Sequence, residues 1–109
     1  MNLEIREIAD LRAILLLEDK LSRQIYKDAQ KLLISHRDAN KEDWINIIEN
    51  ENSEPLNRDQ AFSKMCRETA RRDLPSLLKR LVSELEDRPH AANILEKAKE
   101  YLEHFEDFA

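Results

Sequence analysis

The sequence predicts an all-α protein, a compact antiparallel bundle of five or six helices, and three observations support this. Apolar residues recur three and four positions apart along most of the chain, which is the spacing of one helix face. The 109 residues include no glycine, so tight β-hairpins and glycine-rich phosphate loops, which need a positive φ, are not expected. Charged residues make up 38% of the chain with both signs mixed, which is typical of helices with solvated outer faces.

Length and composition indicate one domain over residues 1–109. A chain of this size buries roughly two-thirds of its unfolded surface, so a core can form without metals or disulfides. Cys66 is the only cysteine, which excludes an intramolecular disulfide and fits a reducing compartment. No apolar run approaches the roughly 20 residues that span a bilayer, and the N-terminus does not resemble a secretory signal. We therefore expect a cytoplasmic protein without a membrane partner.

The first helix is expected over about residues 3–18. Ile8, Leu11 and Leu15 recur at helical spacing there, and residues 14–17 form a continuous apolar run. A short buried strand is the alternative, but the alternation of a strand is missing and the flanking residues are good helix formers. The continuous run predicts that this helix is buried on more than one side.

Short polar side chains mark the start of the next two helices. Ser22 can accept an orphan backbone N–H at the start of the second helix. Residues 36–40 lose the helical period and predict a loop. Asn40 then caps a short third helix that contains Trp44, which we expect in the core.

Prolines and polar residues separate the last three helices. The segment 50–56 is polar, contains a proline and is the clearest loop of the chain. Asn57 and Gln60 resemble a capping box that opens the fourth helix. Pro75 and Pro89 each follow a break and are expected in the first turn of the fifth and sixth helices.

The residue types that perform catalysis form no motif. Cys66 lies in the apolar stripe of the fourth helix, where a buried structural cysteine is more common than a nucleophile. His36 and His90 fall near expected loops as exposed turn residues, and no carboxylate stands in an apolar run that would raise its pKa. Glu100 and His104 are four apart on one helix face, more often an ion pair than half of a metal site. We therefore expect no catalytic, cofactor-binding or metal-binding residues and no small-molecule substrate.

Charge is divided unevenly along the chain. Residues 1–56 include 8 basic and 12 acidic side chains, residues 57–85 include 7 and 4, and residues 86–109 include 3 and 7. The middle segment predicts a basic face, with its first three members on one stripe of the fourth helix: Lys64, Arg67, Arg71, Arg72, Lys79 and Arg80. The flanking segments predict acidic faces: Glu49, Glu51, Glu54, Glu96, Glu100 and Glu103.

Complementary faces of this kind can bind another copy of the chain or a homologous helical domain. An ordinary solvated surface with intramolecular ion pairs is the alternative. Because the chain has a net charge of −5, we expect no nucleic-acid partner, since phosphate contacts need clustered Lys and Arg.

Segments over most of the chain resemble the effector-associated, death-like domains of bacterial conflict systems. They are the leucine-rich residues 11–15, residues 22–23 and 29–33, the sequence ARRDLPSLL at 70–78, and DRP at 87–89. The resemblance implies a six-helix antiparallel bundle of the death fold. It also implies a non-enzymatic adaptor that recruits an effector by like-with-like contact, with the basic stripe at 64–72 and the acidic faces as complementary surfaces.

The leading hypothesis is therefore a non-enzymatic protein–protein interaction module, an adaptor or recruitment domain in a bacterial defence or signalling system. It would act through complementary charged helix faces. One alternative is a stand-alone acidic inhibitor, such as an immunity protein, antitoxin or nucleic-acid mimic, that blocks a basic toxin or nuclease. Another is a helical DNA-binding domain that uses the stripe at 64–72, although the net acidity of the chain counts against it.

Overall fold

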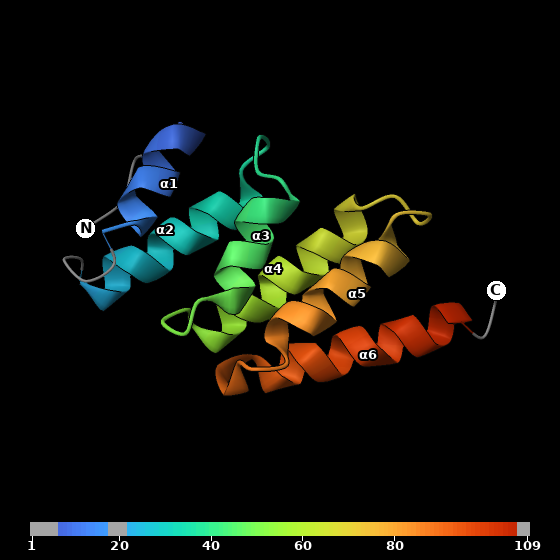
Figure 1. The fold of residues 1–109 in the computed structure, drawn as a ribbon. Helices are drawn as coiled ribbons and strands as arrows, with labels where there is room; N and C mark the ends of the chain where they lie inside the picture. The colour runs from blue at the N-terminus through green and yellow to red at the C-terminus, as the bar shows by residue number, and fades with distance from the viewer. Residues whose placement is uncertain (1–6, 18–21, 107–109) are drawn as a thin grey trace.

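Figure 1 shows the computed structural model, which describes residues 7–17 and 22–106. These residues form six α-helices and one 3-10 turn, with no strand, as the sequence predicts: α1 (Ile8–Leu15), α2 (Arg23–Ser35), α3 (Lys41–Glu49), α4 (Pro55–Glu68), α5 (Leu74–Leu85), η2 (Pro89–Ala91) and α6 (Ala92–Glu106). No helix within these two ranges has the length and apolar character needed to cross a membrane.

The helices are arranged as three antiparallel hairpins that lie side by side (Figure 1). Helix α1 pairs with α2, α3 with α4, and α5 with α6, and neighbouring hairpins meet through α2 and α4, α3 and α5, and α4 and α6. Helices α2, α4 and α6 consequently run in one direction, and the other three return in broadly the opposite direction. The result is a two-layered stack with extents of 48 × 28 × 17 Å.

The hairpins recur at a regular interval. Helices α1, α3 and α5 begin at Ile8, Lys41 and Leu74, each 33 residues after the one before. The second helices of the hairpins contain 13, 14 and 15 residues. The amino-acid sequence shows no internal repeat, so the repetition is found in the arrangement of the helices and not in the residues.

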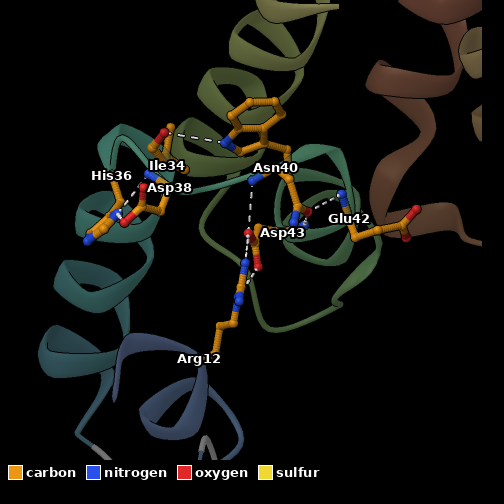
Figure 2. A network of polar contacts seen from close by, with 8 residues as sticks. Arg12, Ile34, His36, Asp38, Asn40, Glu42 and Asp43 are labelled. Carbon is orange, nitrogen blue, oxygen red and sulfur yellow. Dashed lines mark hydrogen bonds and ion pairs between the residues drawn. The ribbon is translucent and has the colours of Figure 1, made fainter. Parts of the chain in front are cut away.

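One apolar core extends through all three hairpins. Leu11, Met65 and Leu81 come from different hairpins and are fully buried. Burying a side chain of this size contributes about 1.5–3 kcal/mol. Trp44 is 5% exposed, and its indole Nε1 donates to the Ile34 carbonyl at 3.3 Å (Figure 2). The predicted core position of the tryptophan is confirmed.

The two predicted polar N-caps are confirmed. The Ser22 hydroxyl accepts from the backbone N–H of Ile25 at 3.2 Å. The side-chain oxygen of Asn40 accepts from the backbone N–H of Asp43, and the Asp43 carboxylate accepts from the backbone N–H of Asn40. These two bonds complete a capping box (Figure 2).

The capping box predicted at Asn57 and Gln60 is wrong. Helix α4 begins two residues earlier, at Pro55, because proline is accepted in the first turn of a helix. Asn57 is fully buried against α2. Its amide donates to the carbonyl of Lys27 at 3.2 Å and to the side-chain oxygen of Gln30 at 3.1 Å.

The first helix is shorter and more exposed than the sequence predicts. It spans Ile8–Leu15, while residues 3–6 and 18 of the expected span lie outside the described residues. The side chains of Leu16 and Leu17 are 85% and 48% exposed, so the expected burial on more than one side is wrong. The physical reason is that α1 belongs to the end hairpin and has a neighbouring hairpin on one side only.

Candidate interaction surfaces

The first and second hairpins are joined by one ion pair in each layer. The Arg12 guanidinium of α1 donates two bonds of 2.7 Å to the Asp43 carboxylate of α3 (Figure 2). Arg23 of α2 binds Glu54, the N-cap residue of α4, at 2.8 Å. Burial of Asp43 would raise its pKa, but the bonds from Arg12 and from the backbone of Asn40 lower that pKa below its ordinary value.

The second and third hairpins are joined in the same way. Arg80 of α5 donates two bonds, of 2.6 and 2.8 Å, to the Glu42 carboxylate of α3. Lys97 of α6 lies 3.4 Å from Asp59 of α4. These four charges stabilise the stack internally and are therefore not free for a partner.

A buried arginine holds the turns at one end of the stack. Arg58 of α4 is 6% exposed, and burial lowers its pKa. Its guanidinium donates to the carbonyls of Ile48 in the last turn of α3, of Asn50 and Ser53 in the α3–α4 connection, and of His90 in the turn before α6, at 2.9–3.1 Å. The connections of the second and third hairpins are thereby tied to one side chain.

The structure divides the predicted basic face. Helix α4 ends at Glu68, so Arg71 and Arg72 lie in the following loop, and the prediction that Arg71 continues the helical stripe is wrong. The guanidinium of Arg71 lies 5.8 Å from the ring centroid of Phe105 on α6, close enough for a cation–π contact.

Two further residues of the predicted basic face form ion pairs with carboxylates. Lys64 lies 3.4 Å from Glu68 on its own helix. Arg80 binds Glu42 and Glu84, and these bonds raise its pKa. The remaining three are exposed and are absent from the ion pairs found within residues 7–17 and 22–106: Arg67, Arg72 and Lys79.

The predicted acidic residues also separate into groups. Glu96, Glu100 and Glu103 are exposed on one face of α6, which lies at the edge of the stack (Figure 1). None of the three takes part in an ion pair among the described residues. Glu51 is exposed in the α3–α4 loop, whereas Glu54 is occupied by the ion pair with α2.

Glu49 differs from the other predicted acidic residues because it lies against Glu84 of α5. Burial, followed by contact with the Glu84 carboxylate, raises the pKa of Glu49 to about 7, although Arg88 opposes the shift. The pKa of Glu84 is lowered by its bond to Glu49. Glu84 Oε2 is buried, and no donor for it is found among the described residues, so a proton on Glu49 is the group that can satisfy it. The expectation that no carboxylate has a raised pKa is wrong here.

The side chains considered for catalysis are held in structural contacts. Burial raises the pKa of the Cys66 thiol to about 11, so the thiol is protonated at neutral pH and is a poor nucleophile. His36 and His90 are half-buried, not exposed as predicted. The His36 ring accepts from the backbone N–H of Asp38 at 3.0 Å, and His90 Nε2 lies 2.6 Å from the carbonyl of Glu49. Within the described ranges, no group of three or more His, Cys, Asp or Glu side chains could hold a metal ion.

Comparisons of the chain with protein-family profiles, with curated proteins and with solved structures gave no match.

Proposed function

We propose that the chain is a non-enzymatic protein-interaction module, an adaptor or recruitment domain that binds a second copy of itself or a homologous helical domain. The observation that supports this is that the exposed charges left out of the ion pairs form two sets of opposite sign on different segments of the chain. We call Arg67, Arg72 and Lys79 the basic end, and Glu96, Glu100 and Glu103 the acidic stripe. Both sets are exposed. The basic end belongs to α4, the following loop and α5, and the acidic stripe belongs to α6. Neither set is neutralised by the ion pairs that join the hairpins.

Two exposed sets of opposite sign favour a head-to-tail contact. A basic end on one copy can meet an acidic stripe on the next, and the pair then retains one unused basic end and one unused acidic stripe. Such contacts are weakened by salt, because screening acts over about 8 Å at physiological ionic strength. The resemblance to death-like domains supports the same proposal, since those modules recruit effectors in bacterial defence by like-with-like contact.

The test is molar mass by light scattering after size exclusion, over a range of protein concentrations in low and high salt. The wild type is expected to form dimers or larger species that dissociate in high salt. The double variant R67E/R72E is expected to stay monomeric. The control K31E/R37E changes two exposed basic residues elsewhere by the same amount and is expected to associate as the wild type does.

A charge exchange makes the test specific for this pair of surfaces. The variant E100R/E103R alone is also expected to be monomeric. Mixed in equal amounts, E100R/E103R and R67E/R72E retain one intact basic end and one intact acidic stripe, so they are expected to form a heterodimer. A wild type that is monomeric at every concentration and salt would contradict binding between copies. Equal loss in K31E/R37E would contradict the assignment of the surfaces.

A further inference from the structure

Within residues 7–17 and 22–106, each end hairpin of the stack has one side that no other hairpin covers (Figure 1). In the first hairpin, Gln30 of α2 faces the second hairpin, to which its side chain is hydrogen-bonded. Successive residues of an α-helix are rotated by about 100°, so residues two positions from Gln30 point the opposite way. Asp28 and Leu32 therefore lie on the uncovered side, and Ile25 lies beside them, one turn before Asp28.

The last hairpin has an uncovered side of the same kind. Lys97 of α6 faces α4, where it lies 3.4 Å from Asp59. Leu95 and Lys99 are two positions away from Lys97 on either side, so they point away from the stack. Leu102 follows Lys99 by three residues and lies on the same side. The apolar residues at both ends of the stack keep part of their surface in water because they are only half-buried: Ile25, Leu32, Leu95 and Leu102.

The other layer of the stack shows the same arrangement. Arg12 of α1 binds α3, and the half-buried Ile14, two positions further on, points away from α3. Arg80 of α5 also binds α3, and the half-buried Val82, two positions further on, points away from it. We call the two uncovered sides the first open side, with Ile14, Ile25, Asp28 and Leu32, and the last open side, with Val82, Leu95, Lys99 and Leu102.

The two open sides match in spacing and in charge. On α2 an acidic residue stands between two apolar residues, three positions after one and four before the other. On α6 a basic residue stands between two apolar residues, four positions after one and three before the other. Helices α2 and α6 run in the same direction, so the two sets can lie side by side with the opposite charges in the middle. The residues that meet are Leu95 and Ile25, Lys99 and Asp28, and Leu102 and Leu32.

The two central charges are not neutralised within the described residues. Lys99 is exposed, and neither Lys99 nor Asp28 takes part in an ion pair there. Asp28 accepts one bond of 2.9 Å from the amide of Gln24, which leaves its charge uncompensated. The exposed charges beside them, Lys31 on α2 and Glu103 on α6, are also of opposite sign and therefore do not oppose the contact.

We infer that the last open side of one copy binds the first open side of the next, with α6 beside α2 and α5 beside α1, so that the stack continues from copy to copy. This contact repeats the way in which hairpins meet within the chain, where α2 lies against α4 and α4 against α6. Few residues are covered, so the contact is weak and forms at high protein concentration.

The inference deepens the proposed function, because the partner is again a second copy. None of the paired side chains belongs to the basic end or to the acidic stripe, however, so the two contacts can fail separately.

The test is cross-linking with a carbodiimide, which joins a lysine amine to a carboxylate only when the two groups are in direct contact. Equal amounts of isotope-labelled and unlabelled wild type are mixed at high concentration, and the joined peptides are identified by mass spectrometry. We expect a Lys99–Asp28 product with one labelled and one unlabelled half, which shows that the residues come from different copies. Lys99 should join the exposed Asp73 and Asp87, which lie outside the first open side, about tenfold less.

Two matched variants test the apolar part of the contact. I25K places a charge on the first open side and is expected to lower the yield of the Lys99–Asp28 product about tenfold. L56K makes the same change at a leucine of α4 that is 57% exposed and is expected to leave the yield unchanged.

Two further variants separate this contact from the others. D28K/K99D exchanges the two charges without changing an apolar residue and should give the cross-link between positions 28 and 99 at the wild-type yield. R67E/R72E, which removes the basic end, should also keep the product. The inference is overturned if the wild type gives no product of mixed label, if I25K and L56K are affected equally, or if either double variant loses the product.

Discussion

The interface between the first two hairpins and the interface between the last two both contain ion pairs, but they differ in a further polar contact. At the first, the Gln30 amide donates to the Ser53 hydroxyl at 2.7 Å, and Asn57 donates to Gln30. These side chains are buried and carry no charge. At the second, the corresponding polar contact joins two carboxyl groups, Glu49 of α3 and Glu84 of α5.

Because of this difference, the contributions of these two polar contacts to stability depend differently on pH. A buried amide network keeps its charge state across the physiological range, so its contribution to stability does not change with pH. The carboxyl pair has a raised pKa on one side and a lowered pKa on the other. Its contribution therefore depends on whether Glu49 holds a proton.

The largest expected change in the free energy of unfolding is at the interface between the first two hairpins. Replacing Gln30, which is 1% exposed, with leucine removes the amide that both Ser53 and Asn57 contact. We expect Q30L to lower the free energy of unfolding by about 2 kcal/mol, because buried polar partners lose a hydrogen bond. Urea unfolding followed by Trp44 fluorescence at several pH values measures it.

The control for Q30L is Q24L, an exposed glutamine on the same helix, with an expected change within about 0.5 kcal/mol. The loss in Q30L should be the same at every pH from 5 to 8. A loss that changes across this range would contradict the contrast between the two interfaces.

A smaller effect, with a pH dependence, is expected at the second interface. The pKa of Glu49 is about 7 in the folded protein against an ordinary 4.5, so the folded state binds the proton more tightly. The stability that Glu49 contributes is fully present below pH 4.5 and is lost as the pH rises through 7. Glu84, whose pKa is lowered, acts in the opposite sense and loses its contribution as the pH falls below 4.5.

Glutamine at position 49 imitates the protonated carboxyl at every pH. We expect E49Q to be more stable than the wild type by about 1 kcal/mol at pH 8, after allowance for solvent screening, and the difference to vanish near pH 5. Thermal unfolding of both proteins across this range measures it. E51Q, which changes an exposed carboxylate in the next loop, is the control and should follow the wild type. An E49Q curve parallel to that of the wild type would argue against the shared proton.

The smallest expected change in stability concerns the two ion pairs between the first two hairpins. Arg23 and Arg12 both bridge the first two hairpins, but the Arg23 side chain is 80% exposed and Asp43, the partner of Arg12, is 7% exposed. We expect R23A to cost less than about 0.5 kcal/mol. R12A should cost more because it leaves a buried carboxylate without its partner. Urea unfolding of both variants tests the order, and a larger loss in R23A would contradict it.

Local signals in the sequence predicted much of the fold. Helical spacing located the helices, and Ser22 and Asn40 cap α2 and α3 as expected, because capping depends on neighbours within three residues. The end of α4 was missed because no glycine or proline follows Glu68. Thr69 ends that helix instead, with its hydroxyl bonded to the Met65 carbonyl.

The interaction surfaces were less predictable because they depend on contacts between distant residues. Asn57 fits a local capping motif, yet the amide of Gln30 on another helix determines its position. The raised pKa of Glu49 depends on Glu84, which belongs to another hairpin. The charge pattern predicts one basic face of six residues, but it does not indicate that Glu42 binds Arg80, one of the six.

The regular 33-residue interval of the hairpins has a consequence for how the chain unfolds. In a linear stack each unit is stabilised mainly by its immediate neighbours, so the stability of the whole is close to a sum of unit and interface contributions. The middle hairpin has two neighbours and the end hairpins have one each. Opening can therefore start at an end without disrupting the centre, and amide hydrogens in α3 and α4 should exchange with solvent more slowly than those in α1.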